Sequence, residues 1–126
     1  MIEQDLVTFL TTRPALTAIQ DTRVYPDRLP QSPPLPAMVF FSISDPASYT
    51  HDGETLKEER FQFDCWAKDP LTAIRQKNEL RNACSGFKGM MGDTYIEAAF
   101  FENSRTLDDD ETGLYRRIAE IVFHYK

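Results

Sequence analysis

The chain has 126 residues, of which 41% are hydrophobic and 27% are charged, and its formal net charge at pH 7 is -6. This apolar fraction is typical of a globular protein with one core and too high for a disordered chain, so we expect a single domain, residues 1–126. Phosphate binding draws on clustered lysines and arginines, and a membrane-spanning helix needs roughly 20 apolar residues, whereas the longest apolar run is 37–41. The composition therefore argues against direct nucleic-acid binding, sequence-specific binding included, and against a membrane segment.

The first ten residues predict a short amphipathic helix. Its apolar side chains recur at helical spacing and comprise Ile2, Leu6, Phe9 and Leu10. Glu3 and Asp5 lie near the positive end of the helix dipole, where a secretory signal would be basic, so we expect no export. Pro14 either ends this helix or begins a second one, because proline is tolerated at a first helical position.

Residues 24–36, VYPDRLPQSPPLP, contain five of the eight prolines and predict an extended crossing segment, neither a helix nor a central strand. Two strands are predicted next, at residues 37–44 and 58–67. In the second, apolar and polar side chains alternate, as on a sheet with one buried and one wet face. The connection between them, residues 45–56, is longer than a hairpin loop, and loops of this size are usually mobile or used for binding.

A second amphipathic helix is predicted at about residues 70–85, with Asp69 as its cap and Pro70 at its first position. Its apolar stripe comprises Leu71, Ile74, Leu80, Ala83, Cys84 and Phe87, and its outer face comprises Arg75, Gln76, Asn78, Glu79 and Asn82. Strands follow at 94–103 and 114–125, and both faces of the last one are partly apolar, which favours a central position. We expect an α+β fold: a mainly antiparallel sheet of about four strands, the 70–85 helix packed on one face, and the short N-terminal helix.

Residues 107–117, LDDDETGLYRR, pose a choice between a metal loop and a turn. The acids Asp108, Asp109, Asp110 and Glu111 are contiguous, whereas a calcium loop alternates its ligands around a glycine at its sixth position. Contiguous aspartates favour turns, so we expect an acidic turn and no metal. Arg116 and Arg117 follow on opposite sides of a strand. They pair either with residues 108–111 of their own chain or with an acidic patch on a neighbouring subunit.

The sequence contains no recognisable catalytic, metal or cofactor site. His51, Asp52 and Glu54 adjoin in the long loop without a marked nucleophile, and Cys65 and Cys84 match neither a zinc nor a redox spacing, so we expect reduced, inert thiols. No glycine-rich phosphate loop is present. The alternative from another class of protein is a small α+β enzyme or ligand-binding domain, with a dimer-interface site built from His51, Asp52 and the acids of residues 108–111.

Four segments resemble a known family when taken in order and at this spacing: RPALTAI, RVYPDRLPQSPPLPAMVF, FQFDCWAKDPLTAIRQKNELRNA and DDDETGLYRRIAEIVFHY. Together they resemble the tail-completion, or head-to-tail joining, proteins of long-tailed bacteriophages and prophages. The resemblance implies a structural virion protein that closes the tail as a ring of identical subunits, commonly a hexamer, and contacts tail-tube and head-connector proteins. It implies no enzyme activity and no cofactor. A head-completion or tail-tube protein is the neighbouring alternative.

The resemblance also implies a place at the head–tail junction of the virion and synthesis in the cytoplasm of the host bacterium. The two connections 45–56 and 107–113 carry more polar residues than folding requires, so we expect them to contact neighbouring subunits or the adjoining tail and head proteins. Tyr49 is the expected anchor, because an exposed aromatic ring offers a large contact area. The full set of candidate interface residues is Tyr49, His51, Asp52, Glu54, Asp108, Asp109, Asp110, Glu111, Arg116 and Arg117.

Overall fold

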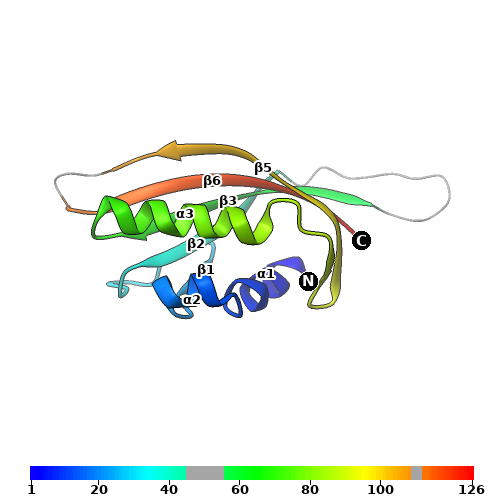
Figure 1. Ribbon diagram of the computed structural model, residues 1–126, viewed down its shortest axis with the longest axis horizontal. Helices are drawn as coiled ribbons and strands as arrows, with labels where there is room; N and C mark the ends of the chain where they lie inside the picture. The colour runs from blue at the N-terminus through cyan, green and yellow to red at the C-terminus, as the bar shows by residue number, and fades with distance from the viewer. Residues whose placement is uncertain (45–55, 109–111) are drawn as a thin grey trace.

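The computed structural model describes residues 1–44, 56–108 and 112–126. Figure 1 shows a long curved sheet with α3 lying along it and with α1 and α2 beside β1 and β2. The elements in chain order are α1 (Ile2–Leu10), α2 (Pro14–Gln20), β1 (Val24–Pro26), β2 (Ala37–Ser44), β3 (Lys57–Ala67), α3 (Pro70–Cys84), β4 (Gly89–Met91), β5 (Thr94–Thr106) and β6 (Tyr115–Tyr125).

The described strands form one sheet in the order β1-β2-β3-β6-β5-β4. β1 runs parallel to β2, and the other described pairings are antiparallel. The predicted α+β class and the central position of the last strand are confirmed. The predicted number of about four strands is too small, because the four long strands are extended by the three-residue strands β1 and β4. A strand of three residues is too short to show a period of two, and Pro26 is compatible with an edge position because its missing N–H breaks no ladder.

An aromatic layer forms the centre of the core. The rings of Phe40, Phe61, Phe63 and Phe123 are fully buried, and their neighbouring centroids lie 5.7–6.4 Å apart. These rings come from β2, β3 and β6, and alternate residues of a strand point to the same face. The helices cover that face with buried side chains that include Leu6, Leu10, Leu16, Leu80 and Cys84.

The start of α3 confirms the predicted cap. The Asp69 carboxylate accepts hydrogen bonds from the backbone N–H of Thr72 at 3.0 Å and from its hydroxyl at 2.7 Å. The hydroxyl bond first, and then the backbone bond, lower the pKa of the Asp69 carboxyl, because both stabilise its charged form. Helix 70–85 therefore begins where the sequence placed it.

Two side chains of α3 face the opposite way from the prediction. Leu71, assigned to the apolar stripe, is 65% exposed, whereas Gln76, assigned to the outer face, is fully buried. The buried row of α3 comprises Ala73, Gln76, Leu80 and Cys84. Gln76 Nε2 donates to Gln20 Oε1 at 2.8 Å and to the Ala37 carbonyl at 3.0 Å. These bonds connect α3 to α2 and β2 and satisfy the N–H donors of the buried amide, whereas its Oε1 has no hydrogen-bond partner among the described residues.

A second buried polar contact fixes α1 against the β4–β5 turn. Asp5 is 8% exposed and accepts a hydrogen bond from the Thr94 hydroxyl at 2.5 Å. Gly92, in the turn, has a φ of +60, and a side chain there would collide with the Asp5 carboxylate. Both the backbone angle and the close approach of Asp5 therefore require glycine at this position.

Replacing Gln76 with alanine is expected to destabilise the protein by about 2–4 kcal/mol, because it leaves a cavity and removes the donor for Gln20 and Ala37. The exposed Asn78→Ala on the same helix is the matched control and is expected to change stability by less than about 0.5 kcal/mol. Urea unfolding of both variants measures the difference. Equal midpoints would contradict a stabilising role for the buried amide.

The two cysteines are expected to be unreactive in the folded protein. Burial raises the pKa of the Cys84 thiol to about 12 and raises that of Cys65 well above its ordinary value, so the nucleophilic thiolate is scarce at neutral pH. Iodoacetamide at pH 8 should modify neither cysteine in the native state and both in urea, as read by intact mass. Cys65→Ala/Cys84→Ala should fold with a loss of about 1–2 kcal/mol per site. Rapid native alkylation would overturn this assignment.

Candidate interaction surface

The sheet has one face that the described helices do not cover. The buried helix residues join a single core cluster whose β3 and β6 members are Phe61, Phe63, Cys65, Ala119, Ile121, Phe123 and Tyr125. The alternate residues of these strands point the other way, among them Arg60, Gln62, Asp64, Arg116 and Glu120. We call this side of the sheet the open face. It carries charged side chains from three adjacent long strands, β3, β6 and β5.

Arg116 is held on the open face by two contacts within the chain. Its Nη2 lies 2.7 Å from Asp64 Oδ2, and the Asp64 side chain is only 6% exposed. Gln62 Nε2 donates to the other oxygen of Asp64 at 2.9 Å. The guanidinium carbon of Arg116 lies 5.0 Å from the centre of the Trp66 ring, a cation–π distance. Asp64 therefore has a charged partner for its buried carboxylate, and Arg116 has a defined position.

A second group of charges on the open face surrounds Glu120. Its carboxylate lies 3.7 Å from Arg60 and 4.0 Å from Arg105, and it accepts a hydrogen bond from Asn103 Nδ2 at 2.9 Å. These contacts join β3, β6 and β5 across the strands. Exposed ion pairs contribute little individually, so the group contributes more to a fixed pattern of charge than to stability.

Arg117 lies on the opposite side of β6, as the alternation predicts, and is paired with Asp108. Arg117 Nη1 lies 2.5 Å from Asp108 Oδ1, and the backbone N–H of Arg116 donates to the same oxygen at 3.2 Å. Asp108 therefore fixes the start of β6. Of the two pairings proposed from sequence, the described contacts show the one within the chain for Arg117. The side chain of Arg116 contacts Asp64, which is neither of the two predicted partners.

The other candidate interface residues lie outside the described part of the chain. They are Tyr49, His51, Asp52, Glu54, Asp109, Asp110 and Glu111. Asp64 and Trp66 were not among the candidates. The alternation in β3 predicts that Asp64 points to the solvent-exposed face of the sheet. This pattern could have identified Asp64 as a candidate partner for an arginine on the adjacent strand.

Neither a metal site nor a membrane span was found in the described residues. No group of three or more His, Cys, Asp or Glu side chains in residues 1–44, 56–108 and 112–126 is arranged to hold a metal ion. Within the same residues, each helix is too short or too polar to cross a bilayer.

Comparisons with known proteins identify the family. Residues 4–125 match the family described as tail completion protein gp17. No curated protein matches the sequence. Among solved structures, a chain of the "Virion of native gene transfer agent (GTA) particle" superposes with a TM-score of 0.71 at 14% identity, covering 94% of this chain and 89% of that chain. At this identity, the likeness shows a shared fold. Because the family match spans nearly the whole chain, this protein belongs to the tail completion protein gp17 family of bacteriophage virion structural proteins.

Proposed function

We propose that this protein completes the phage tail and joins it to the head connector as a ring of six identical subunits. The observation that carries this proposal is the family match over residues 4–125, which includes every described helix and strand except the first residues of α1. The solved structure of similar fold comes from the virion of a gene transfer agent particle, which supports a place in an assembled particle. The proposed location is the head–tail junction, after synthesis in the cytoplasm of the host bacterium.

The charge and shape of the subunit are compatible with this role. A closed ring requires two different surfaces on each subunit that meet head to tail, and the sheet ends in two different edges, β1–β2 and β5–β4. The net charge of -6 suits a ring through which DNA passes, because like charges oppose adhesion to phosphates. The partners in this proposal are further copies of the chain, the tail-tube protein and the head-connector protein.

We further propose that residues 45–56, residues 107–113 and the arginines at the start of β6 contact these partners. Arg116 and Arg117 already bind Asp64 and Asp108 within the subunit. Their guanidinium groups are therefore preorganised, and the unused N–H donors of a guanidinium can bind a second carboxylate from a neighbour. In this role the intrachain acids position the arginines, and the neighbour contributes the second acid.

A variant in which Asp108 and Arg117 are interchanged distinguishes two roles of Arg117: a contact within the chain and a contact with a neighbouring subunit. Arg117→Glu is expected to lower the melting temperature and to reduce particle joining, because it places two acids together. Asp108→Arg/Arg117→Asp is expected to restore the melting temperature but to leave the infectious titre reduced about tenfold or more, because a partner recognises the position of the charge. The measurements are thermal unfolding, complementation of a phage that lacks this gene, and electron microscopy of unjoined heads and tails. Full infectivity of the interchanged variant would limit Arg117 to an intrachain role.

The long connection is tested by Tyr49→Ala and by shortening residues 45–56. Both variants are expected to keep the melting temperature of the parent protein and to yield fewer joined particles in the same complementation assay, because truncating an aromatic anchor removes contact area. Gln31→Ala, an exposed position in the proline-rich segment, is the control and should join normally. Normal joining by both loop variants would remove this segment from the proposed surface.

A further inference from the structure

Both ends of the sheet leave part of a strand edge without a strand partner among the described residues. β1 pairs with positions 38–40 of β2, so within the described part of the chain no strand pairs with the outer edge of residues 41–44. On the other side, β4 pairs with positions 94–96 of β5, and the Gly86 N–H donates to the Ala99 carbonyl. Residues 100–106 of β5 have no such partner among residues 1–44, 56–108 and 112–126, and Figure 1 shows this part of β5 as the outermost strand on that side. Free edges present unpaired N–H and C=O groups to a further strand.

Residues that are paired from strand to strand form rows across the sheet, and the two free edges lie in the same rows. One row runs Ser42, Phe61, Ile121 and Phe101, and the next runs Ser44, Arg60, Val122 and Phe100. Residues 41–44 of β2 are thus level with residues 100–103 of β5, at opposite ends of the sheet. Three successive antiparallel pairings separate β2 from β5, so these two strands run in opposite directions.

We propose that the sheet of one subunit continues into the next, with residues 100–103 of β5 pairing antiparallel with residues 41–44 of β2 in a second copy of the chain. This inference rests on the proposed ring and names the two surfaces that would close it. Because the two edges lie in the same rows, the β5 edge of one copy and the β2 edge of the next can pair without a shift of one copy along the strand direction. Strand addition supplies main-chain hydrogen bonds for affinity, and the side chains beside the edge supply specificity.

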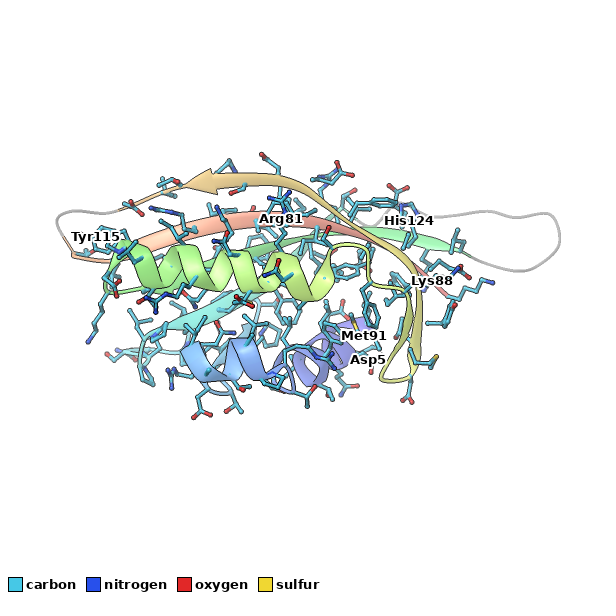
Figure 2. The ribbon with its side chains drawn as sticks, viewed as in Figure 1. Asp5, Arg81, Lys88, Met91, Tyr115 and His124 are labelled. Carbon is cyan, nitrogen blue, oxygen red and sulfur yellow. The ribbon has the colours of Figure 1, made fainter. Side chains whose placement is uncertain are left out.

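The side chains beside the two edges are complementary. Phe100 is 50% exposed and Ile43 is 41% exposed, so each edge carries a large apolar side chain. Beside the β2 edge is a cavity of about 420 Å³, whose lining includes Glu3, Asp27 and Ser42. Ser42 and Phe101 are at opposite ends of one row of the sheet. The guanidinium of Arg81 lies 4.8 Å from the centre of the Phe101 ring. Figure 2 shows Arg81 on the side of α3 toward the long strands. Pairing of the edges brings this cation toward Glu3 and Asp27 of the next copy.

The two edges differ in sequence. The free part of β5 carries Glu102 and Arg105 beside Phe100, whereas residues 41–44 of β2 are Phe-Ser-Ile-Ser and carry no charge. Pairing of two different edges is a head-to-tail contact that can close into a ring, whereas pairing of two like edges ends in a symmetric dimer.

The test is disulfide trapping in purified tails that carry Ser44→Cys/Phe100→Cys. Both positions are exposed, and directly opposed residues of an antiparallel pair lie within the Cα range of a disulfide. Oxidation with copper phenanthroline is expected to convert most of the protein to a ladder of linked oligomers on a non-reducing gel, and reduction should return it to monomer. The same ladder is expected from purified protein at high concentration, at lower yield. A double variant that stays monomeric in both samples overturns the edge pairing.

Single variants and a general cross-linker separate the alternatives. Phe100→Cys alone or Ser44→Cys alone is expected to stay monomeric, and a strong dimer from either would show a symmetric contact and overturn the proposal. An amine-reactive cross-linker reports any oligomer in tails whatever its interface. If it yields six linked copies while the cysteine pair yields none, the ring stands and the edge pairing is wrong. If it yields only monomer, the proposed ring itself is wrong.

The charge contact is tested on the same double-cysteine background. Arg81→Glu is expected to lower the yield of linked oligomers several-fold, and adding Glu3→Lys/Asp27→Lys should restore it. Arg75→Glu, an equal charge change at an exposed position of α3, is the matched control and should leave the yield unchanged. Equal losses from Arg81→Glu and Arg75→Glu would show a general charge effect and remove Arg81 from the contact.

Discussion

Four phenylalanine rings packed between β2, β3 and β6 constrain the rest of this structure, because their burial determines which face of the sheet the helices cover. Once Phe61, Phe63 and Phe123 point into the core, strand alternation directs Gln62, Asp64 and Glu120 to the other face. The charged side chains therefore lie on the open face, beside the apolar Ile118 and Val122 of β6. Its carboxylates then need cationic neighbours, which Arg116, Arg60 and Arg105 supply.

The same constraint leaves the edges of the sheet available. The helices are used to cover one face, and β1 and β4 are too short to protect the full length of β2 and β5. Isolated proteins usually protect exposed edges, because a free edge invites pairing with another chain. In the proposed ring, an unprotected edge would be a means of assembly.

The family match assigns the protein to the tail completion family. The contacts proposed above with other subunits use polar surfaces and strand edges of the described residues. The buried polar contacts inside the molecule are structural: Gln76 connects α3 to α2 and β2, and Asp5 connects α1 to the turn before β5. They hold the helices on the aromatic face and so keep the open face and the edges in position.

Sequence patterns were enough to predict the four long strands, the central position of the last one and the start of α3. These features depend on local signals: a period of two along the strands, and a capping aspartate followed by proline. The sequence alone did not determine the short strands β1 and β4, the burial of Gln76 or the exposure of Leu71. Three residues are too few to show a period, and the side of a helix that is buried depends on the surface it packs against.

The candidate interaction surface was likewise predicted in part from the sequence and in part visible only in the structure. Alternation along the last strand placed Arg116 and Arg117 on opposite sides of the sheet. Only the tertiary structure decided that Arg116 binds Asp64, because those residues are 52 positions apart and meet through the register of β3 on β6. It also decided that the free parts of β2 and β5 lie in the same rows. The register between two strands determines which residues lie side by side, and a change in one register moves all the strands that follow it in the sheet. The sequence of a single strand therefore does not show which residues of a distant strand share its row.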